Sequence, residues 1–347
     1  SQSQTATAIV VMLIGYGVLS VLLSTWLKMP VSIVWSTPGA AFLATSSGLG
    51  VDFETAVGAF IVSSLLVVLT GAWPALSRLV AKIPPQISAA MLAGVIFPFV
   101  AATVHSGVDF PLLIMPVIVI WLLLNRLLPL WASPIAIVIG FALIAMSQEA
   151  KDFEVLSFWP NLAMISPVFD IGVIVAIGIP LYLITMASQN LPGLAIMNGL
   201  GYPLPTSKIF VATGIGSVVT SFFGGFGLNL AAITAALNAD DGAGKDPSKR
   251  WKAAAWGGVV YLIFALFASV FAAFVLAVPR ELLLALAGLA LIKTFASSLR
   301  TAVSDESTRL AGIVTFVIGA AGISVFGIGG AFWALVAGII VWSIRTR

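Results

Sequence analysis

Charged residues are scarce in this chain. Of its 347 residues only 8% are Asp, Glu, Lys or Arg, whereas about 25% is usual for a soluble domain. Hydrophobic residues make up 60% of the sequence, and the mean hydropathy is +1.14. This composition excludes an ordinary soluble globular domain and indicates a membrane protein.

Other absences restrict the chemistry. Cysteine does not occur, which excludes disulfides and thiolate metal sites, and His105 is the only histidine. No stretch resembles a phosphate loop, a zinc motif or a nucleophile triad. We therefore expect no catalytic residues, no metal site and no cofactor, and an intramembrane enzyme is disfavoured.

Long apolar runs are what the sequence does contain. Crossing a bilayer core of about 30 Å takes roughly 20 helical residues, and no alternating ten-residue pattern of a membrane β-barrel recurs. The chain is therefore expected to be an all-α polytopic membrane protein with 13 membrane segments. Eleven are full-length candidates and the last two are short: 4–27, 53–73, 85–104, 110–128, 130–147, 170–190, 205–223, 252–277, 280–299, 308–325, 329–344, 37–48 and 228–238.

Weak internal similarity relates the two halves of the chain. A shift of 194 positions aligns Pro85 with Pro279, and a shift of 200 aligns residues 7–24 with 207–224. The segment 170–190 has no counterpart, so we expect that one N-terminal helix of a seven-plus-seven repeat is missing from this chain. Because seven is odd, the two copies would be inverted relative to each other in the membrane.

The distribution of basic residues supports this topology. If the segments alternate and the C-terminus lies inside, 13 of the 16 Lys and Arg residues fall on the inner side. Basic loops are retained in the cytoplasm. We therefore predict a multi-pass membrane protein with a cytoplasmic C-terminus.

The stretch STPGAAFLAT contains a helix start with no room for a full span. A helix over 37–48 would rise only about 16–18 Å, and its free N–H groups must face protein or a polar cavity because lipid cannot bond them. Ser36 or Thr37 can cap it, and Pro38 suits the first turn. The residues Ser36, Thr37, Pro38 and Gly39 are therefore predicted to bind an anion, although a purely structural re-entrant loop remains an alternative.

The second short segment, 228–238, offers the same device from the other half, with Asn229 as a possible cap. Paired interruptions in the two halves of a transporter indicate its binding site. We expect the two helix starts to meet midway through the membrane.

Three stretches resemble a known family. STPGAAFLAT (36–45), SAAMLAGVIFPF (88–99) and YLITMASQNLPGLAIMN (182–198) are similar to the benzoate/proton symporter family of bacterial inner membranes, which is related in fold to the nucleobase/ascorbate and sulfate-permease transporters. The resemblance implies a core domain that moves against a gate domain, with broken helices at the third and tenth positions. The expected division is 1–77 plus 170–276 for the core, 83–149 plus 278–347 for the gate, and 149–169 as the linker.

The function implied is secondary active import of benzoate or a similar aromatic monocarboxylate with protons, by alternating access. A passive anion channel or an anion exchanger on the same fold is the alternative. The expected partners are the carboxylate anion, protons and the lipid bilayer, without nucleic acid, and a homodimer is left open.

Neutral side chains could hold the substrate. In TMASQNLPG, Ser188 and Gln189 occupy positions that face the substrate in the related fold, and amides can bind a carboxylate without adding charge. Asn190 is equally well explained as the end of the helix before Pro192. Phe226 is the leading candidate for an apolar wall, together with other phenylalanines near the breaks: Phe42, Phe222 and Phe223.

The carrier of the proton is not evident, because all 13 acids lie in loops or near helix ends. Asp170, Glu281 and His105 are possible relays, or the proton travels on the carboxyl group of the substrate. Lys293 lies inside a helix, where it either assists the anion or extends its ammonium group to the inner surface.

Overall fold

A computed structural model describes residues 2–46, 50–73, 75, 84–129, 131–147, 162–231, 233–325 and 328–345. These residues form a nearly all-helical molecule, as predicted. Most of the expected linker, from 148 to 161, lies outside the described residues. The first half contains α1 (Gln2–Leu27), β1 (Ile33–Val34), α2 (Thr37–Ser46), α3 (Phe53–Ala72), α5 (Pro85–Asp109), α6 (Pro111–Leu127) and α7 (Ala132–Met146).

The second half begins with one long helix that includes two π-helical stretches. Its parts are α8 (Ile171–Val173), η2 (Ile174–Gly178), α9 (Ile179–Thr185), η3 (Met186–Asn190) and α10 (Leu191–Gly199). The remaining elements are α11 (Thr206–Ser221), β2 (Asn229–Leu230), α12 (Ile233–Ala239), η4 (Asp241–Ala243), η5 (Pro247–Lys249), α13 (Trp251–Leu266), α14 (Ala268–Ala277), α15 (Arg280–Ala302), α16 (Arg309–Ala320), β3 (Ser324–Val325), β4 (Ile328–Gly329) and α17 (Gly330–Arg345).

Among the described residues, five helices are long and apolar enough to cross a membrane, or six if a bent pair is counted as one span. The five are Gln4–Leu27, Phe53–Ala72, Pro85–Asp109, Ile171–Gly199 and Arg280–Ala302. Several other helices are apolar but shorter than 18 residues. The number of 13 membrane segments therefore stays a prediction.

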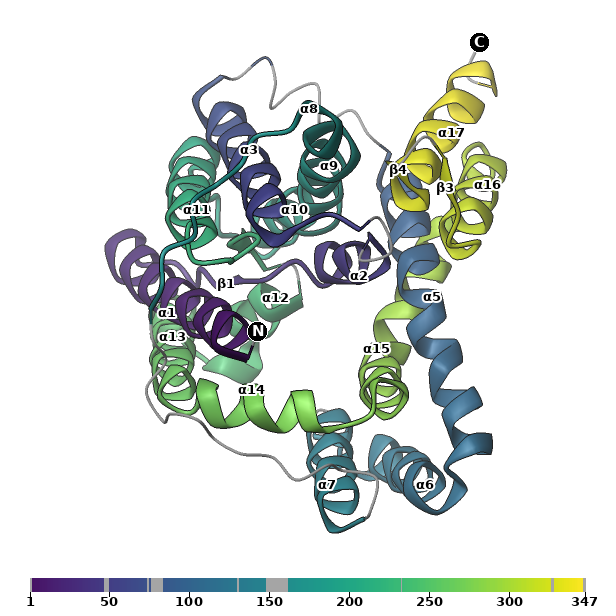
Figure 1. Ribbon diagram of the computed structural model, residues 1–347. Helices are drawn as coiled ribbons and strands as arrows, with labels where there is room; N and C mark the ends of the chain where they lie inside the picture. The colour runs from purple at the N-terminus through teal and green to yellow at the C-terminus, as the bar shows by residue number, and fades with distance from the viewer. Residues whose placement is uncertain are drawn as a thin grey trace.

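Figure 1 shows the helices in two groups, which meet where α2 and α9 contact α5 and α17 and are bridged elsewhere by α14. One group holds α1–α3 and α9–α13, and the other holds α5–α7 and α15–α17. Glycines allow close approach within the second group, since a Cβ atom on Gly288 of α15 would overlap the carbonyl oxygen of Phe99 on α5. Thr103 of α5 also donates a hydrogen bond of 2.9 Å to the carbonyl of Ala285.

The two broken segments cross at β1 and β2, which form an antiparallel pair with Ile33 opposite Leu230 and Val34 opposite Asn229. The short helix α2 starts three residues after β1, and α12 starts three residues after β2. The prediction that both segments are interrupted is thus confirmed. That the two helix starts meet midway through the membrane stays a prediction.

Serine side chains hold the crossing in a matching way in both halves. Ser20 of α1 accepts a hydrogen bond of 2.9 Å from the backbone N–H of Ile33, and Ser217 of α11 accepts one of 2.7 Å from that of Leu228. A hydroxyl can both accept and donate. One serine in each half therefore provides a hydrogen-bond partner for extended backbone that has no further strand beside it among the described residues. The repetition of this contact is what an internal repeat requires.

The sequence predicts that the helix beginning at Ile171 ends at Asn190, just before Pro192, and this prediction is wrong. The helix continues to Gly199 through the π-helical stretch Met186–Asn190, in which the N–H of Leu191 bonds to the carbonyl of Met186. Proline lacks an N–H and clashes with a carbonyl one turn earlier, and the wider π turn relieves that conflict. The stretch before Pro180, Ile174–Gly178, is built in the same way.

The predicted span 252–277 is also wrong as a single helix. It breaks at Phe267, and α13 and α14 meet at an angle of 66°. After the break, α14 runs toward the second group of helices (Figure 1), where Phe141 of α7 packs against Phe271 and Phe274 with ring centroids 6.3 and 5.4 Å apart. The helix α14 therefore connects the two groups.

Candidate functional site

A cavity of about 700 Å³ lies beside the crossing, bounded by α1, the β1–α2 segment, α12, α13 and α14. Its volume falls within the usual range for small-molecule sites. Three of its lining residues carry neutral polar side chains: Thr37, Gln189 and Thr234. Six others are aromatic: Tyr16, Trp35, Tyr261, Phe264, Phe267 and Phe271.

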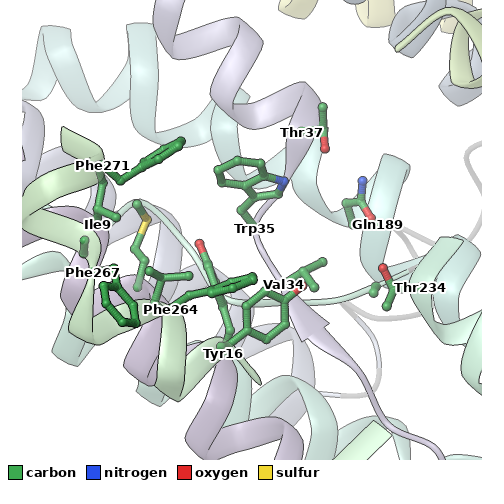
Figure 2. A pocket seen from close by; sticks show the side chains of 15 residues that line it. Ile9, Tyr16, Val34, Trp35, Thr37, Gln189, Thr234, Phe264, Phe267 and Phe271 are labelled. Atoms are coloured by element: carbon green, nitrogen blue, oxygen red, sulfur yellow. The ribbon is translucent and has the colours of Figure 1, made fainter. Parts of the chain in front are cut away.

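Polar and aromatic side chains occupy different sides of this cavity. Figure 2 shows Phe264, Phe267 and Phe271 gathered on one side and Thr37, Gln189 and Thr234 on the other, with Trp35 and Tyr16 between them. Trp35 is 51% exposed although it sits at the crossing. The cavity therefore offers a flat apolar wall and, across from it, a small set of uncharged hydrogen-bonding groups.

The start of α2 opens onto the polar side. Ser36 caps the helix, because its hydroxyl accepts a hydrogen bond of 3.0 Å from the N–H of Gly39 and its carbonyl accepts one of 2.8 Å from Ala40. Pro38 occupies the first turn, where its missing N–H is not needed. Thr37, the first residue of α2, lines the cavity. The positive end of the helix dipole therefore faces this region.

Two asparagines form hydrogen bonds to the backbone at the crossing of the two broken segments. The Asn190 side-chain oxygen accepts a hydrogen bond of 3.0 Å from the N–H of Leu230, and its amide nitrogen contacts the sulfur of Met186 at 3.2 Å. Asn229, with its amide oriented to suit its neighbours, accepts from the N–H of Ser36 at 3.2 Å. Asn229 thus belongs to β2 and does not cap α12, which begins at Ile233. Asn229 can bond to Ser36 of the first half because the antiparallel pairing places Asn229 opposite Val34.

The contact between Asn190 and the crossing can be tested through stability. Asn190 is completely buried, so Asn190→Ala would leave the N–H of Leu230 without its acceptor. We expect a loss of about 1–3 kcal/mol in the free energy of unfolding, measured by thermal or denaturant unfolding of the purified protein. Asn198→Ala, on an exposed turn of the same helix, is the control and should change stability by less than about 0.5 kcal/mol. Equal stability of the two variants would contradict the assigned role.

Other predicted contacts lie away from the cavity wall. The Ser188 hydroxyl donates a hydrogen bond of 2.6 Å to the carbonyl of Ile184 in its own helix. Phe226 packs edge-on against Phe60, with ring centroids 6.4 Å apart. Phe42 is 1% exposed and belongs to the hydrophobic core. Of the predicted substrate contacts, Thr37 and Gln189 reach the cavity.

The aromatic wall comes instead from α13 and α14, where we had not expected a site. Tyr261, Phe264, Phe267 and Phe271 recur at intervals of three and four residues, the spacing that places side chains on one face of a helix. This stripe was visible in the sequence. On a continuous membrane helix such residues could equally well contact lipid or pack against neighbouring helices, so the stripe alone did not indicate a cavity.

Charged side chains are absent from the lining of this cavity among the described residues. Asp170 caps α8 by accepting a hydrogen bond of 2.8 Å from the N–H of Val173, and Glu281 and His105 are exposed elsewhere. Lys293 is exposed and donates a hydrogen bond to the carbonyl of Pro129, so it ties α15 to the turn between α6 and α7. Within the described ranges no group of three His, Cys, Asp or Glu could hold a metal ion.

Comparison with known proteins places this geometry in context. A family model described as benzoate membrane transport protein matches residues 1–344. The inner membrane protein YdcO of Escherichia coli (strain K12) is 38% identical over 95% of this chain and 84% of its own length. The benzoate membrane transport protein of Acinetobacter baylyi (strain ATCC 33305 / BD413 / ADP1) is 30% identical over 96% of this chain and 84% of its length.

A solved structure shares the fold. The transmembrane domain of the cyanobacterium bicarbonate transporter BicA aligns with a TM-score of 0.64 at 16% identity, covering 97% of this chain and 96% of that one. At this level of identity the likeness concerns the fold alone. It agrees with the inverted repeat inferred from the sequence.

Proposed function

The chain belongs to the benzoate membrane transport protein family, and from this membership we propose that it is a secondary active transporter that imports benzoate or a similar aromatic monocarboxylate together with protons. Membership in the family supports a membrane transporter. The choice of substrate is supported by the relative from Acinetobacter baylyi, whose name specifies benzoate, and by the chemistry of the cavity.

The division of the cavity into a polar and an aromatic side carries this proposal. A benzoate ion has a carboxylate at one end and an apolar ring at the other, and the cavity has Thr37 and Gln189 opposite Phe264 and Phe271 (Figure 2). The carboxylate would accept hydrogen bonds from the two polar side chains, beside the positive end of α2. The ring would lie against Trp35, since offset stacking and edge contacts favour aromatic pairs.

Alternating access would move the substrate-binding group of helices against the gate. We propose a core of 1–77 plus 170–276 and a gate of 83–149 plus 278–347, connected in the second half by α14. The break at Phe267 supports α14 as the connection, because this helix contacts α1 on one side and Phe141 of α7 on the other. The wide contact between α5 and α15 gives the gate an internal packing of its own.

The proton is proposed to cross on the carboxyl group of the substrate. This route is favoured over Asp170, Glu281 and His105, which are exposed and do not line the cavity. A buried carboxylate in the wall would repel the anion, and none lines the cavity in the described part of the chain. The net reaction would then move no charge across the membrane.

Uptake of labelled benzoate into proteoliposomes tests the proposal. With an inward proton gradient we expect a faster initial rate, and for one-to-one symport an accumulation of about tenfold per pH unit, abolished by a protonophore and insensitive to membrane potential. Protein-free liposomes are the essential control, because neutral benzoic acid crosses lipid unaided, and only the protein-dependent rate counts. Uptake that follows membrane potential and ignores the protonophore would indicate a channel, and uptake that requires an internal anion would indicate an exchanger.

A further inference from the structure

Lysine and tryptophan side chains are paired at one end of α1. The ammonium group of Lys28 lies 4.1 Å from the ring centroid of Trp251, and that of Lys252 lies 5.9 Å from the same ring. On the other side, the ammonium group of Lys208 lies 4.8 Å from the ring centroid of Trp26. These five residues form what we call the basic–aromatic patch.

Three helix ends build the patch. Trp26 and Lys28 lie at the end of α1, Lys208 at the start of α11, and Trp251 and Lys252 at the start of α13. Figure 1 shows α1 between α11 and α13, which agrees with the contacts of α1 to both helices. All three lysines are exposed, and Trp26 is 62% exposed. The patch therefore faces the surroundings of the protein and is separate from the cavity.

The backbone at Lys28 is unusual. Its φ of 54° makes it the one non-glycine residue with a left-handed backbone among the described residues. Glycine normally fills such a position just after a helix, because a side chain there is strained. Lysine at this position is therefore less favourable for the backbone than glycine would be, but its ammonium group lies over the ring of Trp251.

Nearby acids do not neutralise the patch. Asp241 forms a salt bridge with Arg250, and Asp246 forms one with Lys249 at 3.3 Å. These are the two salt bridges found within the described residues, and neither uses Lys28, Lys208 or Lys252. The patch thus combines three uncompensated ammonium groups with two indole rings, a residue type that favours the membrane–water interface.

We propose that the basic–aromatic patch binds the phosphate headgroup of an anionic phospholipid. Ammonium groups beside a membrane attract anionic lipid, and the indole rings would lie at headgroup level while they orient the lysines by cation–π contact. The predicted topology places all three lysines on the inner side, where the positive-inside rule retains basic residues. This proposal is independent of the transported substrate.

The test measures lipid binding to the purified full-length chain in detergent by native mass spectrometry. The probes are dioleoyl phosphatidylglycerol, dioleoyl phosphatidylcholine and inorganic phosphate. We expect selective retention of phosphatidylglycerol, and about fivefold weaker binding for each lysine removed in the series Lys28→Asn, Lys208→Gln and Lys252→Gln. A control with the same loss of charge on the same predicted side replaces three exposed basic residues outside the patch by Gln: Arg126, Lys245 and Arg300.

The single variant Lys28→Gly separates structure from binding. Glycine relieves the left-handed backbone, so this variant should be at least as stable as the wild type while it binds phosphatidylglycerol about fivefold more weakly. Equal loss of lipid in the patch and control triple variants would show a general charge effect and overturn the proposal. Undiminished binding in Lys28→Gly, or inorganic phosphate bound as tightly as the lipid, would overturn it as well.

Discussion

Replacing Gln189 by leucine is expected to lower the kcat/KM of benzoate uptake about 10- to 100-fold, because a hydrogen bond to a charged group contributes about 1.5–3 kcal/mol. Gln189 lines the polar side of the cavity together with Thr37 (Figure 2). Leucine has a similar size but offers no donor to a carboxylate, so the KM should rise. Initial rates in proteoliposomes over a range of benzoate concentrations give this value.

Ser188→Ala is the matched control for Gln189→Leu. It removes a polar group from the neighbouring position, but that hydroxyl bonds to Ile184 within the helix and does not line the cavity. We expect its kcat/KM to stay within about threefold of the wild type. Thr37→Val, which removes the hydroxyl at the start of α2, should resemble Gln189→Leu. A normal KM in Gln189→Leu, together with a large loss of kcat/KM in Ser188→Ala, would show that the substrate does not bind in this cavity.

Gly288→Ala is expected to have the largest effect on stability. A Cβ atom at this position of α15 would overlap the carbonyl oxygen of Phe99 and the hydroxyl oxygen of Thr103, both on α5. A backbone carbonyl inside a packed helix cannot move aside as a flexible side chain can. The two helices must separate, which should cost about 3 kcal/mol or more and also break the hydrogen bond from Thr103 to Ala285.

The measurement is the thermal unfolding midpoint of the purified protein, together with the yield of monodisperse protein. Gly257→Ala on α13 is the control, because no atom outside its own helix and chain neighbours lies within 4 Å of the added Cβ. Alanine is the better helix former by up to about 1 kcal/mol, so this variant should be unchanged or slightly more stable. If Gly288→Ala unfolds at the same temperature as Gly257→Ala, the close packing of α5 and α15 is refuted.

Local features of the sequence account for what could be predicted. The run Ser36–Gly39 marks a helix start by capping and proline chemistry, which depend only on adjacent residues. The following apolar stretch is too short to cross the bilayer, and the matching break in the second half shows that the interruption is repeated. These features were sufficient to predict Thr37 as a site residue, whereas Gln189 was predicted from the resemblance of the motif TMASQNLPG to the symporter family; both line the cavity.

Features that depend on distant segments required the tertiary structure. Pro192 indicates a helix end by local rules, yet the π turn at Met186–Asn190 lets the helix continue, and nothing in the local sequence distinguishes these outcomes. Likewise, the aromatic stripe of α13 and α14 becomes a cavity wall only because the chain bends by 66° at Phe267. The direction of that bend is set by packing against α1 and α7.

The sequence by itself determined a helical membrane protein with two opposed, interrupted segments, because hydropathy, capping and repetition are properties of the chain alone. Only the tertiary structure decided that Asn190 and Asn229 support the crossing, and that the ring-binding wall comes from α13 and α14. Those roles arise from contacts between residues about 40 to 200 positions apart, whose geometry is set by how all the helices pack together.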